Sequence, residues 1–404
     1  MSTWLRSKTK LKRDYIIASI LLVNTFSWLF IGQKIVIEIA DLFDKQLFFN
    51  LGFYASIIAS ALIGSVFSAK INKTRFFYIW LSFGTIASLF LGIPFDSPFV
   101  ALAIAIIFGV SVGLGIPSCL AYFAESVPIE KRGKVGGISL FVTIFSVPLV
   151  TIAISPLDLM TSALAFAAWR GCCLLVLPSI SRKDYCLAVE KRPPSLNAVV
   201  KNKTFILYFV AWLMFSLVDC FEGLVLSSHI GEFLFLMNIM EPMIAGISAL
   251  IAGVLSDWVG RKRVLIFGFV SLGVAYAIVS LTSQIWISWV FYFVIDGVAL
   301  GLLWVLFIIV IWGDLSKAGR EKYYAIGSMP FFLTRITSLF FAPHVSLIPE
   351  TGIFSLAAFF LFIAVIPLLY APETLPEKKI QQRQLKIYTE EALKLKQEIE
   401  QKPK

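Results

Sequence analysis

Five ionisable residues in the second half of the chain lie inside long apolar stretches. They are four acids and one base: Asp219, Glu222, Glu241, Asp296 and Arg335. An ionisable side chain in hydrocarbon costs at least about 2.5–3.5 kcal/mol, so it is usually retained only where it pairs with another group or does work. One arginine can neutralise only one of the four acids. The other acids are therefore candidates to take up and release protons.

The depth of these residues along their apolar stretches suggests which of them meet. At 1.5 Å per residue, Arg335 lies roughly 20 Å from one end of its stretch, and Asp296 roughly 15 Å from the opposite end of its own. We therefore expect Asp296 and Arg335 at one depth, where they could form a static bridge between two helices. Glu241 is expected at a similar depth or at the headgroups. Asp219 and Glu222 could instead lie at the outer interface.

The composition indicates a polytopic membrane protein. Of the 404 residues, 58% are hydrophobic and only 15% are charged, which leaves too little polar surface for a soluble protein of this size. The formal net charge of +10 lies in loops and tails, so we expect no nucleic-acid partner. The five cysteines and two histidines show no metal-binding spacing. We therefore expect no metal site and no cofactor.

Apolar stretches of roughly 20 residues are long enough to cross a bilayer. The sequence predicts twelve such spans, at about 15–38, 47–69, 76–94, 98–123, 135–156, 159–180, 204–227, 233–256, 264–282, 286–312, 323–347 and 350–371. With both termini in the cytoplasm, nearly all lysines and arginines fall in cytoplasmic loops and tails. The exceptions are Lys34, Lys45, Arg170 and Arg335. This bias supports the count of spans and a multi-pass topology, which we expect in the plasma membrane.

The spans divide into two halves. A cytoplasmic tail, 1–14, precedes a six-helix bundle over 15–180, and a cytoplasmic central loop, 181–203, leads to a second bundle over 204–371 and a charged cytoplasmic tail over 372–404. A shift of 189 residues places Gly64 on Gly253 and Glu125 on Asp314. The expected fold is an all-α membrane protein with twelve transmembrane helices in two six-helix bundles related by an internal repeat.

The short polar loop after the eighth span carries the clearest motif. It contains glycines, an acid and a basic run at fixed spacing: Gly253, Asp257, Gly260, Arg261 and Lys262. These residues match the G-x-L-x-D-x-x-G-R-[RK] loop signature of the major facilitator superfamily of transporters, which the chain resembles. The resemblance implies that this loop joins the second and third helices of a six-helix half. It also implies that the charges form part of an inner gate.

A second motif follows the fourth span. Residues 125–133 resemble the E-x-x-P-x-x-x-R-G signature of the sugar-porter and general substrate-porter branches, which implies that Glu125 and Arg132 join the inner gate. Pro372-Glu373-Thr374 is similar to the end of sugar porters. The paired glutamines of sugar porters are absent, however, and so is the span-four arginine of drug/proton antiporters. The motifs therefore favour a general substrate or sugar-porter-like branch over drug/proton antiporters, and they do not establish sugar as the substrate.

Two further basic residues lie within the spans of the first half. Arg170 follows Trp169, and sugar porters have a similar Trp-Arg pair at the outer start of the sixth span. We include Arg170 among the residues for substrate binding or coupling, either in the cavity or at the outer interface. Lys34 and Glu38 are four residues apart, so we expect a local ion pair at the outer mouth.

These observations predict a secondary active transporter that moves a small polar or anionic metabolite by alternating access, as a proton-coupled symporter. The expected partners are that solute, H⁺ and the lipid bilayer, and the expected state is a monomer. The alternatives are a sugar or polyol importer or uniporter, a drug or metabolite efflux antiporter, and a transporter-like nutrient sensor. An enzyme is not expected, because His-Glu-x-x-His and Gly-x-Ser-x-Gly are absent. No G-x-x-x-x-G-K loop is present to bind ATP.

Overall fold

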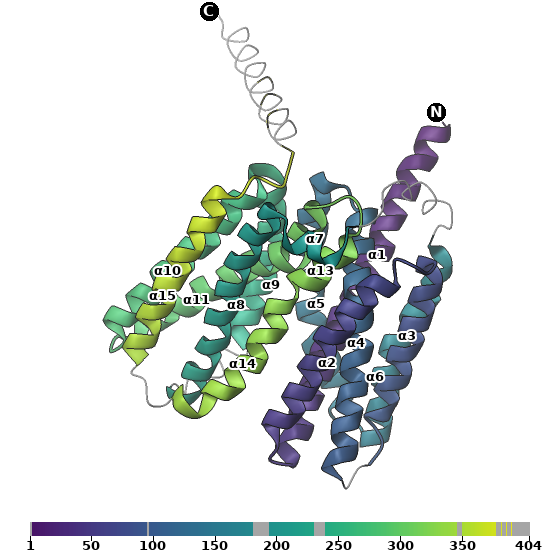
Figure 1. The fold of residues 1–404 in the computed structure, drawn as a ribbon, viewed down its shortest axis with the longest axis horizontal. Helices are drawn as coiled ribbons and strands as arrows, with labels where there is room; N and C mark the ends of the chain where they lie inside the picture. Colours follow the sequence, from purple (N-terminus) through teal and green to yellow (C-terminus); the bar gives the residue numbers. More distant parts are fainter. Residues whose placement is uncertain are drawn as a thin grey trace, which may run out of the picture.

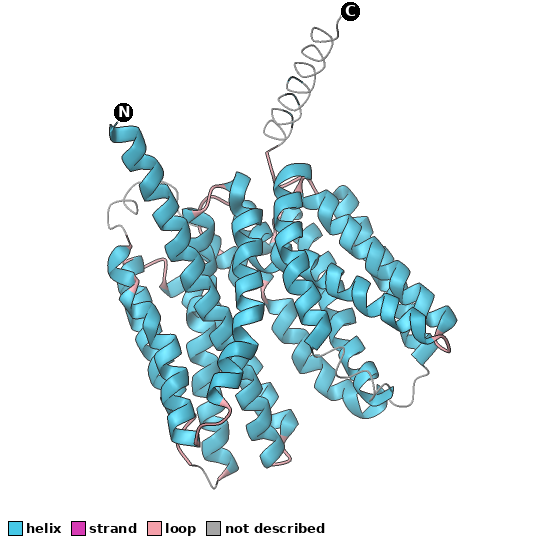
Figure 2. Ribbon diagram, turned by 180° about the vertical axis from the view of Figure 1, so that it is seen from behind, coloured by secondary structure: helices cyan, strands magenta, loops and turns pink. Residues whose placement is uncertain are grey.

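The computed structural model describes residues 2–94, 97–180, 194–229, 239–345 and 350–376, together with 381, 385 and 389. All the regular secondary structure in these ranges is helical (Figures 1 and 2). Most of the predicted tail beyond 376 and part of the predicted central loop, 181–193, lie outside the described residues.

The first half of the chain forms six long helical segments. They are α1 (Ser2–Leu42), α2 (Gln46–Phe67), α3 (Lys73–Phe90), α4 (Pro98–Ser126), α5 (Arg132–Ile154) and α6 (Leu159–Gly171), with short 3₁₀ turns at Ile129–Lys131, Cys172–Leu175 and Leu177–Ser179. Asn72 caps α3 by accepting from the Thr74 backbone N–H at 3.0 Å. Asp158 caps α6 through the Thr161 hydroxyl and backbone N–H, and these bonds lower the pKa of Asp158.

The second half is built in the same way but is more interrupted. Its elements are α7 (Leu196–Val200), α8 (Lys203–His229), α9 (Glu241–Val259), α10 (Arg261–Thr282), α11 (Trp286–Trp304), the π-helix η6 (Val305–Val310), α12 (Ile311–Asp314), α13 (Arg320–Gly327), α14 (Met329–Val345) and α15 (Glu350–Tyr370). α11, η6 and α12 continue one another as a single span, Trp286–Asp314. Such π segments are rare and often occur at functional sites.

Ten of the described helical segments are long and apolar enough to cross a membrane. The other two spans are α3, which starts with basic residues, and the pair α13–α14, which is broken at Ser328. The predicted all-α architecture of twelve spans in two related six-helix bundles is confirmed. α1 begins at Ser2, before the predicted start of the first span at 15. The predicted start of the eighth span, at 233, lies outside the described residues, which resume at 239.

The two bundles stand side by side, and the start of α1 lies at the same end as the chain segment that follows α15 (Figure 1). We call this end the terminal face. Within the first bundle α2 packs on α4 and α3 on α6, and within the second α10 packs on α15 and α9 on α11. Across the boundary between them, α5 packs on α9, α2 on α14 and α4 on α13. The bundles therefore meet along several helix pairs.

The α5–α9 crossing depends on small residues from both bundles. A Cβ atom built on Gly253 would collide with the Gly133 carbonyl oxygen, and one built on Gly137 would collide with the Ala249 carbonyl oxygen. Backbones that approach so closely require glycine at the contact. Gly253, which the motif had marked for the inner gate, therefore acts by letting the two bundles touch.

Replacing Gly253 with alanine should separate α5 from α9, because backbone cannot move aside as a side chain can. We expect a loss of about 1–3 kcal/mol in the free energy of unfolding, as for other overpacked sites, seen as a lower melting temperature in detergent. Gly223→Ala is the matched control, since its Cβ would meet nothing within 4 Å. Equal melting temperatures for the two variants would contradict the tight crossing.

Candidate functional site

A cluster of buried charges joins the two bundles at the terminal face. Asp314 at the end of α12 accepts from Arg132 of the first bundle and, at 3.3 Å, from Arg261 of the second. Arg261 also pairs with Asp257 at 2.5 Å. The four side chains are at most 4% exposed. We call Arg132, Asp257, Arg261 and Asp314 the gate cluster.

Asp257 also crosses the boundary by capping a helix of the other bundle. Its carboxylate accepts the backbone N–H groups of Gly133 at 3.0 Å and Lys134 at 2.8 Å, in the first turn of α5. The start of a helix has unpaired N–H donors and partial positive charge, so a carboxylate there is favourable. The aspartate of the loop motif thus ties α9 to α5 by hydrogen bonds as well as by charge.

The rest of the loop motif shapes the start of α10. Gly260 has φ +106°, a backbone conformation that residues other than glycine rarely adopt. Glu373, from the Pro-Glu-Thr stretch after α15, accepts the backbone N–H groups of Arg261 at 2.9 Å and Lys262 at 3.1 Å. The Lys262 ammonium donates to the Leu369 carbonyl at 2.6 Å. Gly260 and Lys262 therefore fasten α10 to α15 within one bundle, and the structure gives Lys262 no contact with the gate cluster's acids.

Glu125 lies in a second group of charges beside the gate cluster. Its carboxylate pairs with Lys73, at the start of α3, at 2.6 Å. Lys73 also reaches Glu321 of α13, in the other bundle, at 3.2 Å. The sequence motif grouped Glu125 with Arg132, but in the structure these two residues have different partners.

The acids of the second bundle divide into three contacts. Arg335 pairs with Asp219 at 3.3 Å, so the expected pairing with Asp296 was wrong. Asp296 lies near Glu241, and Glu222 accepts a hydrogen bond from the hydroxyl of Tyr276. Two carboxyl groups that lie close together in a low dielectric cannot easily both be ionised. We call Asp219, Glu222, Glu241 and Asp296 the acid cluster.

Arg170 lies in the core of the first bundle, apart from the acid cluster. Its guanidinium is sandwiched between Trp28 and Trp80, 4.2 and 4.3 Å from the ring centroids. It donates to Asn24 at 3.0 Å and Thr25 at 3.1 Å, and no ion pair is found for it among the described residues. Cation–π contacts of this kind can hold a desolvated arginine. The structure therefore does not bring Arg170 together with the other coupling candidates.

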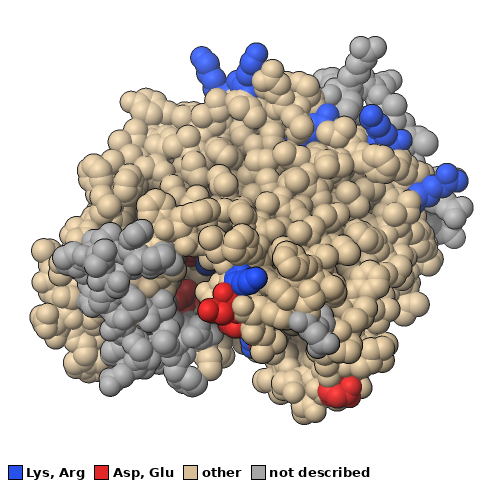
Figure 3. All heavy atoms as spheres, turned by 60° about the horizontal axis from the view of Figure 1, so that its bottom comes forward, with Lys and Arg blue, Asp and Glu red and all other residues tan. Residues whose placement is uncertain are grey.

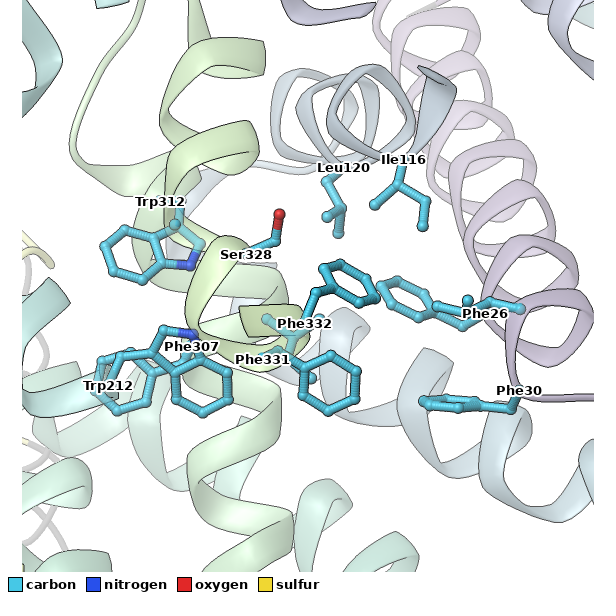
Figure 4. A pocket seen from close by; sticks show the side chains of 13 residues that line it. Phe26, Phe30, Ile116, Leu120, Trp212, Phe307, Trp312, Ser328, Phe331 and Phe332 are labelled. Atoms are coloured by element: carbon cyan, nitrogen blue, oxygen red, sulfur yellow. The ribbon is translucent and has the colours of Figure 1, made fainter. Parts of the chain in front are cut away.

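A small aromatic cavity lies where the two bundles meet (Figure 4). Its volume is about 30 Å³, and its walls come from α1 and α4 on one side and from α8, η6 and α12–α14 on the other. The lining includes Phe26, Phe30, Trp212, Phe307, Trp312, Ser328, Phe331 and Phe332. The indole N–H groups of Trp212 and Trp312 have no hydrogen-bond partner among the described residues. The cavity is nearly filled in this conformation.

The face opposite the termini differs from the terminal face. It is hollowed, and acidic and basic side chains lie at the hollow (Figure 3). Lys34 and Glu38 of α1 form the expected pair, at 4.0 Å, with both side chains more than half exposed. One end of the boundary between the bundles is thus held by buried ion pairs, while the other end is hollow.

The structure adds four residues to these charge clusters that the sequence did not predict as site residues: Lys73, Tyr276, Asp314 and Glu321. The 189-residue shift had already placed Glu125 on Asp314, so the repeat held a signal for that acid. Lys73 is one of several basic residues in its loop, and Glu321 stands between two basic residues, Arg320 and Lys322. Nothing in the sequence marked Tyr276 among the many aromatics.

Comparison with known proteins points to one family. The family model of the Major Facilitator Superfamily matches residues 188–400, more than half of the chain. No match is found among curated protein sequences. The human organic anion transporter MFSD10 (TETRAN) has a similar structure, with a TM-score of 0.65 at 12% identity, over 89% of this chain and 99% of that one.

Two structures of XylE are also similar. One is the proton:xylose symporter bound to 6-bromo-6-deoxy-D-glucose, with a TM-score of 0.60 at 19% identity, over 89% of this chain and 96% of that one. The other is a double tryptophan mutant, with a TM-score of 0.61 at 16% identity, over 92% of this chain and 99% of that one. At these sequence identities, the similarity to both proteins concerns the fold alone.

Asp314→Asn should destabilise the protein strongly, because it leaves Arg132 and Arg261 buried with less negative charge than they need. Breaking a buried pair costs about 3–5 kcal/mol. Glu125→Gln is the matched comparison, since Glu125 occupies the repeat-related position but is 32% exposed, and we expect a loss of about 1 kcal/mol or less. Unfolding in detergent measures both. Equal losses would contradict the different burial of the two acids.

Proposed function

This chain belongs to the major facilitator superfamily, and we propose that it is a proton-coupled secondary transporter that carries a small polar solute by alternating access. The members of this family sit in the membrane and move small molecules across it. The coupling, the solute and the residues that bind it are our proposal. We further propose that it acts as a monomer in the plasma membrane, with the terminal face in the cytoplasm, as the distribution of basic residues indicates.

The observation that carries the proposal is the contrast between the two ends of the bundle boundary. The gate cluster joins the bundles at the terminal face with buried ion pairs, whereas the opposite face is hollowed (Figure 3). Rocking of two bundles around a central site requires such a difference, reversed in the other state. We propose that this conformation is closed to the cytoplasm and that separation of the gate cluster accompanies opening to it.

The acid cluster supports coupling to protons. Among the described residues, only Asp219 of this cluster has a basic partner, Arg335. The carboxyl groups of Glu241 and Asp296 lie near each other, so a proton on one of them relieves their repulsion. Glu222 and Asp296 are buried, at 7% and 5% exposed. If an acid is accessible from one side of the membrane in one conformation and from the other side in the second, a proton bound to it can cross together with the solute. We propose Asp296, with Glu241, as the main carrier.

The aromatic cavity supports a polar, neutral solute over an anion. Arg335 already faces Asp219, which removes much of the reason for expecting a carboxylate or phosphate. The cavity lining contains aromatic rings, two unpartnered indole donors and no charged side chain. Rings can stack on the apolar faces of a polyhydroxylated ring, and the indoles can donate to its oxygens. A sugar or polyol fits this lining, and an organic anion is the second candidate class.

The proton carrier can be tested with Asp296→Asn in proteoliposomes. We expect the chain to accumulate one compound from a panel of sugars, polyols and organic acids, driven by a pH gradient and with proton uptake. In Asp296→Asn, gradient-driven accumulation should fall by about tenfold or more, while solute counterflow, which needs no net proton movement, should persist. Glu38→Gln is the matched control because this acid is 63% exposed.

Accumulation in Asp296→Asn equal to that of the native protein would contradict Asp296 as the carrier. Solute flux with no dependence on the pH gradient in the native protein would contradict proton coupling and favour a uniporter.

The gate can be tested with Asp257→Asn. The amide keeps a similar shape but cannot pair with Arg261 as a charge, and it can accept only at its carbonyl oxygen. We expect net transport to slow by about three- to tenfold while the solute dissociation constant stays the same, because the exchange of conformations changes and the cavity does not. Arg263→Gln, an exposed position in the same loop, is the control. Unchanged flux in Asp257→Asn would contradict the role in the gate.

A further inference from the structure

A crevice in the second bundle lies apart from the aromatic cavity at the bundle boundary. Its walls come from α8, α10, α14 and α15. Of these helices, α8 packs on α14 and α15, and α15 packs on α10 (Figure 1). Among the described residues, the crevice shares no lining side chain with the aromatic cavity. We call it the lateral crevice, and its volume of about 430 Å³ is in the range of sites that bind small molecules.

The lateral crevice opens among apolar side chains on the outer surface of the bundle. Phe341, Leu356 and Phe360 line it and are exposed, whereas Val225 and Phe354, which also line it, are buried. These residues belong to membrane-spanning helices, so the exposed ones face the hydrocarbon of the bilayer. A ligand therefore reaches the crevice from the lipid.

One ionisable carboxyl group lies in this apolar lining. Glu222 is the only charged side chain among the described residues that line the crevice, and it is 7% exposed. It lies roughly 10 Å along α8 from the end of that helix at His229, at about 1.5 Å per residue. Its carboxylate accepts a hydrogen bond from the Tyr276 hydroxyl, but it has no ion-pair partner in the described part of the chain. A buried negative charge held in this way lacks a cation.

The groups around Glu222 also favour a cation in the crevice. Glu241 and Asp219 lie near enough to act on its charge, and Arg335 is already paired with Asp219. The surplus charge is therefore negative. It attracts a cation, whereas a phospholipid would bring a phosphate group toward these acids.

The rest of the lining suits a bulky apolar body. The rings of Phe221 and Phe341 meet edge to face, with centroids 5.2 Å apart, and Phe360 and Tyr276 add two more rings. Aromatic faces attract both apolar groups and the polarised hydrogens of an ammonium. The crevice thus combines a deep carboxylate with rings along its walls.

We infer that the lateral crevice binds a lipophilic amine that enters from the bilayer, with its ammonium at Glu222 and its apolar body among the phenylalanine rings. The ammonium completes the pairing that this acid lacks within the protein. The amine is a ligand on the lipid-facing side of the second bundle, and it is not the solute carried between the bundles. Its binding requires no transport.

A matched pair of probes tests the recognition of the ammonium. Amantadine and its alcohol analogue, in which a hydroxyl replaces the amino group, share one bulky hydrocarbon cage, but only the amine is positively charged at neutral pH. Binding of tritiated amantadine to the purified native protein in phosphatidylcholine nanodiscs is measured by scintillation proximity, with each unlabelled compound as competitor. We expect the amine to compete at a concentration at least about tenfold lower than the alcohol. Equal potency of the two compounds would overturn the inference, because the crevice would then take apolar bodies without recognising charge.

Two substitutions then locate the site. Glu222→Gln removes the charge and keeps the shape of the side chain, so the affinity for amantadine should fall about tenfold, to that of the alcohol. Ala357→Phe places a ring in the crevice that Ala357 lines, so saturable binding should be lost. Glu38→Gln, at an acid that is 63% exposed, is the control and should bind like the native protein.

The outcomes separate the lateral crevice from other binding sites. Amantadine binding that keeps its native affinity in Glu222→Gln or in Ala357→Phe would place the amine elsewhere and overturn the inference, as would the lack of saturable binding to the native protein. Melting temperatures check that each variant is folded. The competition between amine and alcohol on the native protein needs no variant, so it decides on charge recognition even if one variant fails to fold.

Discussion

The position of the two bundles depends above all on the carboxylate of Asp314, which two arginines from different bundles share. Removing a charge from water costs several kcal/mol, and that cost is offset only when partners and hydrogen bonds are complete. The gate cluster balances its charges as a set, because two arginines face two aspartates and Asp257 also receives two backbone N–H groups. Its one buried donor without a hydrogen-bond partner among the described residues is the Nε–H of Arg132. Such a set of charges is stable when its members are paired and buried, or when they are separated and solvated by water. Intermediate arrangements leave a buried charge without a partner, so the contact behaves as a switch between two states.

The charges inside the bundles are arranged differently. The acid cluster has four acids against Arg335 alone, and Arg170 has tryptophan rings and neutral acceptors in place of an acid. A balanced set holds its charges in place and fixes structure. An unbalanced set of acids in a low-dielectric region cannot all be ionised, and so its members exchange protons when their surroundings change. The contrast in charge balance separates the residues that hold the conformation from those proposed to couple it to protons.

The sequence predicted the fold well because the signals for spans are local. Apolar length and basic loops fix which segments cross the membrane, and they depend on no long-range contact. The partners of the charges were less predictable. Asp219 and Asp296 are both acids within apolar spans, and which of them faces Arg335 depends on helix rotation and tilt. Arg170 found its partners in Trp28 and Trp80, and a sequence does not distinguish such rings from lipid-facing ones.

The two halves of the repeat have diverged at the gate, and the divergence follows a physical logic. In the second bundle Asp257 caps the start of α5 across the boundary. Its repeat-related residue, Ser68, is buried, and its hydroxyl has no partner among the described residues. A neutral serine cannot provide the negative charge that a helix start favours. Lys73 and Glu321 form a direct ion pair across the boundary between the bundles on this side. One side of the terminal face is therefore held by the buried gate cluster with its helix cap. The other side has one lysine between two acids, of which Glu125 is partly exposed. Salt screens charges near water more than buried ones. The two sides of the terminal face therefore differ in how strongly they hold the bundles and in how far ionic strength weakens them, although their residues lie at repeat-related positions.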